Sequence, residues 1–378
     1  MFGPVDRAGT HAYKWERDKG KNLIPLWVAD MDLASPQAIV DALSERARHP
    51  IYGYTHPWPS LNQSVVDWCQ QEYHWAIEAN WIVWMPGVVP SFNLACDLLA
   101  KGGRVLVQTP NYPPMLQAAE RQGGQTVTLP VHWHNDGWHL DWTQLEAEMA
   151  HPDCHLFMLC NPMNPNGAVL SALDLAKISA LCQQYDVLVC SDEIHCDLIL
   201  DPVQHHPAGS IAGLEDISIT LMAASKTFNV AGLGCSFAII ANPRLRADWQ
   251  QRMADLVPYP NFMGMIAAEA AFSSCKGWHT QLLSHLKGNR DLIDSRINRL
   301  EGLVYRPQPA TFLAWIESTQ PGLALDEHFI KAGLMPSEGK FFGQADNSRL
   351  NFGTDRATLE RAMQLFSDYW QQNRPWES

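Results

Sequence analysis

The chain has 378 residues, of which 46% are hydrophobic and 18% charged, and it carries a formal net charge of -13. This composition is typical of a globular protein large enough for two domains. The negative charge argues against nucleic acid or an anionic membrane surface as the principal partner, because both attract basic patches. A small-molecule partner is therefore favoured.

The nine cysteines include no Cys-x-x-Cys pair. Cys160, Cys190 and Cys196 lie in apolar runs, where a free thiol behaves as a small hydrophobic side chain. This pattern indicates a reducing compartment. The first residues do not form a basic region followed by an apolar core, and no apolar run approaches the roughly 18 residues of a membrane span. We therefore expect a soluble cytoplasmic protein.

The first 25 residues are polar and irregular, and residues 25–32 then become apolar. Ser35-Pro36 predicts an N-cap and a first helical residue for a helix that ends near Arg48. Residues 51–59 are rich in proline and aromatic side chains, so this loop is either core packing or a ligand wall. Ser60 is expected to cap the next helix, to about Tyr73.

From residue 81 onward, short apolar segments alternate with helical ones. This alternation predicts a mostly parallel sheet with helices on both faces. The expected strands lie at 81–84, 104–108, 126–131, 155–160, 187–190, 217–224 and 235–241, and the expected helices at 90–101, 114–121, 141–149 and 172–185.

Beyond residue 243 the pattern becomes helical, with a long apolar periodicity over 278–300 that indicates a helix bridging two domains. The remaining segments predict strands at 311–316 and 349–352 and helices at 326–332 and 358–370. We expect three parts: an N-terminal arm with part of the small domain (1–48), a large domain (49–280) and a smaller α+β domain (281–378).

Ligands of mostly parallel sheets bind at the carboxyl ends of the strands. Polar, chemically active residues should therefore follow the predicted strands, and they do so at several of them. These segments are 87–89, 109–112, 161–167, 191–195 and 225–226. Their convergence predicts one ligand-binding crevice.

Lys226 directly follows one of these apolar segments and lies in a short polar turn. Burying a lysine is costly unless its charge is paired or its pKa is lowered. A lysine with a depressed pKa is the usual nucleophile for Schiff bases with carbonyl compounds and with pyridoxal phosphate (PLP). The alternative is a surface lysine at a strand end.

Three motifs occur in order: Asn161-Pro162-x-Asn164-Pro165-x-Gly167, Asp192-Glu193-Ile194-His195 and Ser225-Lys226-Thr227-Phe228-Asn229. Together they resemble the fold-type I PLP enzymes of the aminotransferase class I/II superfamily, over nearly the whole chain. Trp27-Val28-Ala29-Asp30-Met31-Asp32 and Tyr52-Gly53-Tyr54 are similar, more narrowly, to the PatB/MalY-type cystathionine β-lyases. The resemblance implies a mostly parallel seven-stranded α/β domain with a smaller α+β domain, a PLP cofactor and a homodimer.

The resemblance also implies roles for individual residues. Lys226 would bind PLP as a Schiff base and then act as base and acid at the substrate α-carbon. Asp192 would face the pyridine nitrogen, Asn164 would donate to the phenolic oxygen, and Tyr112 would stack on the ring. Arg349 would clamp the substrate α-carboxylate. The alternatives are a solvated acid or helix cap for Asp192, core packing for Tyr112 and an ordinary strand-edge arginine for Arg349.

The expected phosphate site consists of backbone amides at Val88 and Val89, where a helix begins, together with the Ser225 hydroxyl. Tyr54 from a second subunit is expected to add a contact, as in the family arrangement. Many aminotransferases have an arginine eight residues after the lysine. This chain has Gly234 there, so its phosphate site must rely on amides and hydroxyls.

His195 occupies a position where many aminotransferases have a tyrosine that contacts the phenolic oxygen. Histidine can donate the same bond, although a histidine at a strand end is often structural. Ala29 and Asp30 belong to the segment that faces the substrate in relatives, through backbone or side-chain contacts. The pairs His132-x-His134 and His205-His206 lack companions at metal-ligand spacing, so surface loops are favoured and no metal is expected.

These inferences predict a PLP-dependent carbon–sulfur β-lyase that converts cystathionine or a related cysteine thioether into a thiol, pyruvate and ammonia. A PLP-dependent aminotransferase is the alternative, because both reactions use the same cofactor site and the same first steps. A PLP-bound regulatory or interaction protein is a further alternative from another class.

Overall fold

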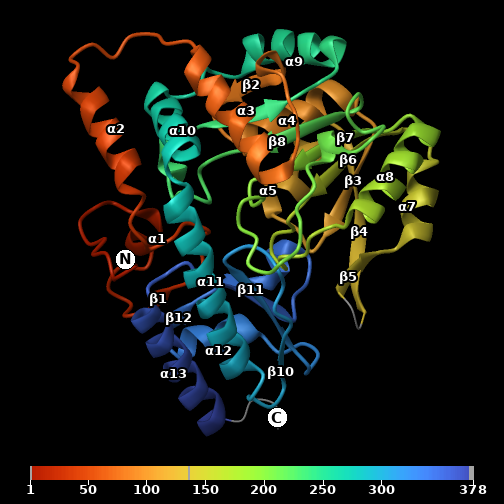
Figure 1. Cartoon of the computed structure of the whole chain (residues 1–378). Coiled ribbons are helices and arrows are strands. Elements are labelled where there is room, and N and C mark those ends of the chain that lie inside the picture. Colours follow the sequence, from red (N-terminus) through yellow and green to blue (C-terminus); the bar gives the residue numbers. More distant parts are fainter. Residues whose placement is uncertain (1, 135–136, 374–378) are drawn as a thin grey trace.

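The computed structural model describes residues 2–134 and 137–373 (Figure 1). A large sheet with its helices forms the upper part of the molecule in this view, and a smaller sheet with the C-terminal helices forms the lower part. The long helix α11 (Lys276–Ile297) runs between the two parts, as the apolar periodicity predicts.

The large sheet contains eight strands in the order β2-β9-β8-β7-β6-β3-β4-β5. The strands from β8 to β4 in this order are parallel to their neighbours, whereas β9 is antiparallel to both β8 and β2. Their bounds are β2 (Ile82–Met85), β3 (Arg104–Thr109), β4 (Gln125–His134), β5 (Gly137–Leu140), β6 (Cys154–Cys160), β7 (Leu188–Asp192), β8 (Ser218–Met222) and β9 (Ser236–Ile239). The predicted α/β class and mostly parallel sheet are confirmed.

The eighth strand, β5, is absent from the sequence prediction. It pairs antiparallel with β4, which continues past its expected end at Val131. His132 and His134 therefore lie in a strand, and the loop expected there is wrong. The cross-strand pair of Trp133 and Trp138, with ring centroids 5.7 Å apart, accounts for the extension, because aromatic pairs stabilise antiparallel strands.

Helices cover both faces of the large sheet. Alternate residues of its parallel strands face α4 and α9 on one side and α7 and α8 on the other, while α3 and α10 pack over β2 and β9. The bounds in this part are α2 (Gln37–Arg48), α3 (Pro59–Tyr73), α4 (Val88–Leu99), α5 (Pro113–Leu116), α6 (Ala118–Arg121), α7 (Trp142–Met149), α8 (Ala172–Tyr185), α9 (Pro243–Leu256) and α10 (Phe262–Ser274), with 3-10 helices η1 (Ala79–Trp81), η2 (Ala208–Ser210) and η3 (Ala231–Leu233).

The two predicted serine caps are wrong. Helix α2 begins after Pro36 without a side-chain cap, and the Ser35 hydroxyl instead donates to the Asn229 carbonyl oxygen at 3.0 Å. Helix α3 begins at Pro59, so Ser60 lies within its first turn. In the first case the hydroxyl bonds to a partner far along the chain; in the second, proline at the first helical position starts the helix before Ser60 rather than after it.

The small sheet has the order β10-β11-β14-β13 and is antiparallel throughout. A separate parallel pair joins β1 near the N-terminus to β12. The bounds are β1 (Ile24–Pro25), β10 (Leu303–Tyr305), β11 (Leu313–Ser318), β12 (Leu334–Met335), β13 (Ser337–Glu338) and β14 (Asn347–Asn351), with α1 (Tyr13–Glu16), α12 (Leu325–Lys331), α13 (Arg356–Asn373) and the 3-10 helix η4 (Gly339–Phe342).

One apolar core joins residues of the N-terminal segment, from Ile24 to Leu33, to residues of α11, α12, α13 and the small sheet. The N-terminus therefore packs with the C-terminal part rather than with the large sheet that follows it in the chain. The division into 1–48, 49–280 and 281–378 remains a prediction. No helix in the described ranges is both long and apolar enough to cross a membrane.

All nine cysteines are free thiols, and only Cys235 is partly exposed. Burial raises the pKa of the thiols, to about 11 for Cys154 and Cys275 and to about 12 for Cys96. Among the described residues, no group of three or more histidine, cysteine or acidic side chains is arranged to hold a metal ion.

Candidate active site

The predicted site residues gather at the carboxyl edge of the large sheet. Asp192 is the last residue of β7, and the neighbouring strands β8, β6 and β3 end shortly before Lys226, Asn164 and Tyr112. Because these strands are parallel, their carboxyl ends meet at one edge. The alternation of strands and helices therefore places these four side chains in one region.

Lys226 is partly exposed and hydrogen-bonded to the backbone of a distant segment. Its Nζ donates to the Ala29 carbonyl oxygen at 2.6 Å. Burial, followed by the charge of Arg349, lowers the pKa of Lys226 to about 8, against the raising effects of Asp30 and Asp192. A much larger fraction of this lysine is therefore a free amine near neutral pH than of an ordinary lysine, as a nucleophile requires.

Asp192 is a buried carboxylate with little support from the protein. Its side chain is 4% exposed, and its Oδ1 accepts a hydrogen bond of 3.1 Å from the Ile194 N–H. Burial raises the pKa of Asp192 to about 6, against the smaller lowering effects of that hydrogen bond and of Lys226. Such a group fits a cationic or protonated nitrogen of a ligand, which would restore the ionised form.

His195 and Tyr112 flank these charges. His195 is 2% exposed, and its Nδ1 has no hydrogen-bond partner within residues 2–134 and 137–373. Burial, followed by the charges of Lys226 and Arg349, lowers the pKa of His195, so the ring is neutral. Burial raises the pKa of Tyr112, which also experiences the charges of Arg349 and Asp192. The charge of Arg349 therefore reaches both rings, and that of Lys226 reaches His195.

Arg349 reaches the same region from β14 of the small sheet. Its Nη1 donates to Asn164 Oδ1 at 3.0 Å, and its Nη2 donates to the Trp27 carbonyl oxygen at 2.6 Å and to Ser337 Oγ at 3.1 Å. Burial lowers the pKa of Arg349 to about 10, and Nε has no partner among the described residues. A guanidinium with an unmatched donor at this place fits a carboxylate ligand.

The segment of residues 27–33, hereafter the arm, lies between the Lys226 turn and β14. Sequence reasoning placed Ala29 and Asp30 toward the substrate, and the Ala29 contact to Lys226 is through the backbone. The Asp30 carboxylate instead pairs with Arg7 at 2.9 Å, and Asp32 pairs with the buried Lys14 at 2.7 Å. The carboxylates thus anchor the arm to the N-terminal residues.

Helix α4 begins at Val88, and no side chain among the described residues caps its first turn. The amides of Val88 and Val89 therefore remain available to an anion at the positive end of the helix dipole. Gly234 has a left-handed φ of 56° and lies beside Pro86, which precedes this turn. The structure thus places the glycine that replaces the expected arginine next to the predicted phosphate site.

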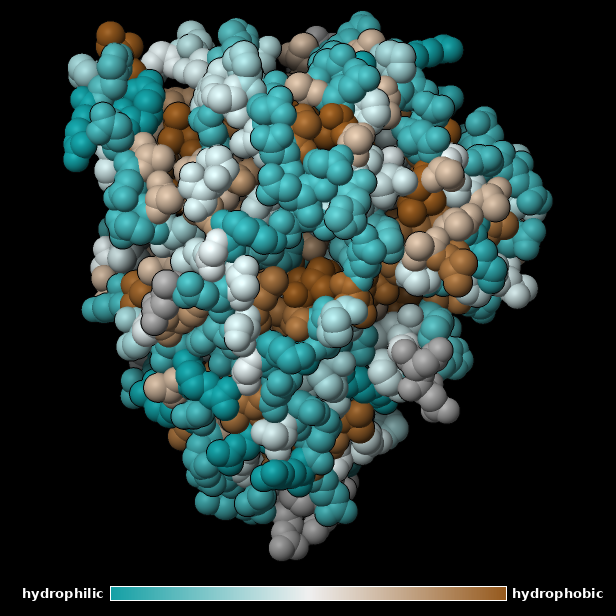
Figure 2. All heavy atoms as spheres, viewed as in Figure 1, coloured by the Kyte–Doolittle hydropathy of each residue, from teal (hydrophilic) through white to brown (hydrophobic). Residues whose placement is uncertain are grey.

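Ser225 is partly exposed and directly precedes Lys226. Tyr54 is not part of the cluster: its side chain is fully exposed on the loop before α3. In the space-filling view, apolar side chains gather in a hollow between the upper and lower parts of the molecule (Figure 2). A ligand entering between the two parts would meet both polar and apolar groups.

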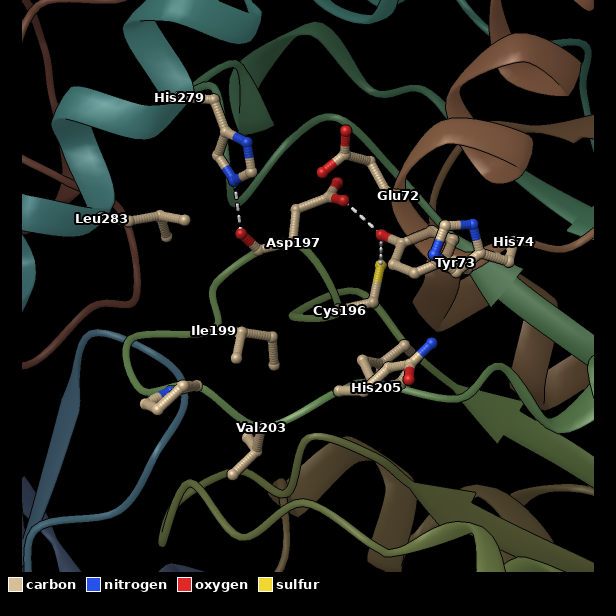
Figure 3. Close-up of a pocket in the computed structure, with 12 residues that line it drawn as sticks. Glu72, Tyr73, His74, Cys196, Asp197, Ile199, Val203, His205, His279 and Leu283 are labelled. Atoms are coloured by element: carbon tan, nitrogen blue, oxygen red, sulfur yellow. Dashed lines mark hydrogen bonds between the residues drawn. The ribbon is translucent and has the colours of Figure 1, made fainter.

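A separate cavity of about 380 Å³ lies beyond the end of β7 (Figure 3). None of the predicted site residues lines it. The Asp197 carboxylate accepts hydrogen bonds from Tyr73 and, at 2.9 Å, from Trp68 Nε1. Nearby, His205 bonds to Glu193 at 2.8 Å and is 3% exposed, so the surface loop expected for His205 is wrong. The hydrogen bonds around this cavity leave His205 Nδ1 and His279 Nδ1 without a partner among the described residues.

Sequence reasoning missed two asparagines that contact the arm. Asn229 hydrogen-bonds to the backbone of Met31 and Leu33, and Asn351 to that of Val28 and Asp30. Their positions close to Lys226 and Arg349 were visible in the sequence. Their partners were not, because the contacts join residues between 196 and 323 positions apart.

Comparison with known proteins places the chain in a family. The aminotransferase class I and II family model matches residues 21–366. Cystathionine beta-lyase PatB of Bacillus subtilis is 34% identical over 94% of this chain and 95% of its own length. Among solved structures, OvoB has a TM-score of 0.94 and 36% identity over 98% of both chains. A PLP-bound C-S lyase from Staphylococcus hominis, complexed with L-cycloserine, has a TM-score of 0.91 and 26% identity over 97% of both chains. The chain therefore belongs to the aminotransferase class I and II family.

Proposed function

We propose that the protein is a PLP-dependent carbon–sulfur β-lyase that cleaves cystathionine or a related cysteine thioether into a thiol, pyruvate and ammonia. One observation carries the proposal: a lysine with a pKa lowered to about 8 lies at the carboxyl edge of the sheet beside a buried carboxylate. The names of PatB and of the Staphylococcus hominis C-S lyase support the choice of reaction.

The residues fit PLP at each of its polar groups. The uncapped start of α4 fits the phosphate, the under-supported Asp192 fits a protonated pyridine nitrogen, and Lys226, whose pKa is lowered to about 8, fits the aldehyde. Asn164 and His195 would contact the phenolic oxygen. When bound, PLP supplies an electron sink that stabilises negative charge at the substrate α-carbon.

The chain's own residues then have separate tasks. Arg349 would orient the substrate by its α-carboxylate through its unpartnered Nε–H, while its Nη2 keeps its bond to the Trp27 carbonyl oxygen. Lys226 Nζ, as a free amine, would take the proton from the α-carbon. Tyr112 and the apolar side chains in the hollow between the two parts would limit the access of water. The departing thiolate leaves from the β-carbon, and hydrolysis of the remaining three-carbon unit yields pyruvate and ammonia.

We also propose that the protein is a homodimer in which Tyr54 contacts the phosphate of the partner's cofactor. Tyr54 is fully exposed, and the neighbouring Ile51, Tyr52 and Tyr259 are also largely exposed. Exposed aromatic side chains of this density usually mark an interface. Light scattering of the purified protein tests the dimer; a monomer at micromolar concentration contradicts it.

The decisive test is product analysis with the purified PLP-loaded protein. We expect pyruvate from cystathionine and from S-substituted cysteines, detected by coupled reduction to lactate, and no release by Lys226→Ala. Exchange of an amino group between an amino acid and a 2-oxo acid, without pyruvate release, would establish the aminotransferase alternative. Partner binding that is unaffected by Lys226→Ala, in a protein without either activity, would favour the regulatory alternative.

A further inference from the structure

The arm is held on one side by the side chain of Asn229. Its Oδ1 accepts from the Met31 N–H at 3.0 Å, and its Nδ2 donates to the carbonyl oxygens of Met31 and Leu33 at 2.9 and 2.7 Å. Asn229 lies three residues after Lys226 and has a left-handed φ of 57°, a conformation that asparagine tolerates better than most residues. The turn that carries Lys226 is therefore joined directly to the arm.

Asn351 holds the arm from the other side. Its Nδ2 donates to the carbonyl oxygen of Asp30 at 2.6 Å and to that of Val28, and its backbone N–H donates to Leu26 at 2.8 Å. Asn351 lies two residues after Arg349 on β14. The strand that carries Arg349 is therefore joined to the same arm.

Between these two attachments, the arm contacts both functional side chains. The Ala29 carbonyl oxygen accepts from Lys226 Nζ, and the Trp27 carbonyl oxygen accepts from Arg349 Nη2, each at 2.6 Å. The arm thus spans the distance between the proposed base and the proposed carboxylate clamp. Lys226 follows a strand of the large sheet and Arg349 lies in the small sheet, and among the described residues no hydrogen bond joins the two side chains directly.

We propose that Asn229 and Asn351 are positioning residues that fix the separation of Lys226 and Arg349 through the arm. This inference rests on the proposed function, because the separation matters only if one substrate contacts both groups. A displacement of about 1 Å between reacting groups can reduce a rate by about 100-fold, so a spacer held by five side-chain hydrogen bonds has a direct effect on turnover.

The kinetic test compares Asn229→Ala, Asn351→Ala and the double variant of the PLP-loaded protein with cystathionine. We expect Asn229→Ala to lower kcat and Asn351→Ala to raise KM, each by about 10-fold. Because both act through one arm, kcat/KM of the double variant should fall little further than that of the poorer single variant. A double variant equal to the product of the two single effects overturns the proposal.

Asn298→Ala is the matched control. Its amide also binds both backbone groups of one residue, Tyr305, at 2.8 Å each, but over a separation of 7 residues and without a hydrogen bond to the arm. This variant should retain wild-type kcat and KM. Asn229→Asp serves as a second variant: it keeps an acceptor for the Met31 N–H but loses the amide donor, and it should be as impaired as Asn229→Ala.

Hydrogen exchange of the PLP-loaded protein provides a readout that is independent of the reaction. We expect amide exchange in peptides covering residues 27–33 to be about 10-fold faster in Asn229→Ala and Asn351→Ala than in the wild type, and unchanged in Asn298→Ala. Faster exchange in the two variants supports the positioning role even if no pyruvate is released. Unchanged exchange overturns it even if the lyase activity is established.

Discussion

Two buried aspartates near the end of β7 have opposite surroundings. Asp192 and Asp197 are 4% and 5% exposed. Asp197 receives hydrogen bonds from the side chains of Trp68 and Tyr73, whereas Asp192 receives one from the Ile194 backbone and has a pKa raised to about 6. Asp197 borders an open cavity but has two side-chain donors, whereas the buried charge of Asp192 is supported by a single backbone donor. Incomplete satisfaction of buried charge, rather than the size of a hollow, therefore identifies the candidate site.

The largest effect should come from Lys226→Ala, which removes the proposed nucleophile of the site that contains Asp192. Pyruvate release from cystathionine should fall by at least about 1,000-fold. Visible absorbance of the PLP-loaded protein should also change. Retention of more than a tenth of the activity would mean that the unsatisfied groups around Asp192 serve another purpose.

Asp192→Asn should be nearly as severe, with kcat lower by about 100-fold, because a neutral amide cannot keep a ring nitrogen protonated. The purified variant is assayed at saturating PLP, so that loss of cofactor affinity is separated from loss of turnover. A kcat within twofold of the wild type would remove the distinction between the two aspartates.

Arg349→Lys tests the same site from the small sheet. Lysine keeps the charge but loses the planar, bidentate donor, so KM should rise by about 10- to 100-fold with a smaller change in kcat. Steady-state kinetics with cystathionine measure both. A substrate analogue without the carboxylate should show no difference between the wild type and this variant.

The pKa of Asp192 also predicts how the stability of the cofactor-free protein depends on pH. Because the folded-state pKa is raised above 3.8, the protonated carboxyl stabilises the fold below about pH 4, and this contribution is lost as the pH rises through about 6. Asp192→Asn should therefore raise the unfolding free energy at pH 7.5 by up to about 3 kcal/mol, and hardly at pH 4. Denaturant titrations at the two pH values measure this; equal gains would contradict it.

Asp197→Ala should have the smallest effect on catalysis and a clear effect on stability. It leaves the Trp68 donor unsatisfied and Tyr73 with only the weak acceptor Cys196 Sγ, at a cost of about 2–4 kcal/mol in unfolding free energy. The folded variant should retain kcat within about twofold. A large loss of kcat at full folding would show that the cavity belongs to the catalytic machinery.

The parallel sheet and its edge could be predicted because they rest on local patterns. Helix α8 begins and ends at the predicted residues, Ala172 and Tyr185, and Ser171 and Asp174 form a capping box at its start. The strands were recognisable as apolar runs between helices. Since parallel strands share a carboxyl edge, their order along the chain was sufficient to bring Asp192 and Lys226 together.

The arm could not be predicted in the same way. The bond between Asn351 and Val28 joins residues 323 positions apart, and local periodicity has no information at that separation. Ser35 shows the same limit, because its hydroxyl donates to the carbonyl oxygen of Asn229 and does not cap the helix that it precedes. His205 likewise has the composition of a surface loop and is buried by its pairing with Glu193.

The buried cysteines have a consequence for a protein that would release thiols. Thiol–disulfide exchange requires a thiolate and access to it. Burial raises the pKa of each of these cysteines, and only Cys235 is partly exposed. Thiol products and the disulfides that they form in air would therefore find almost no thiolate on the enzyme. The fold thus keeps its own sulfur atoms out of mixed disulfides with its products.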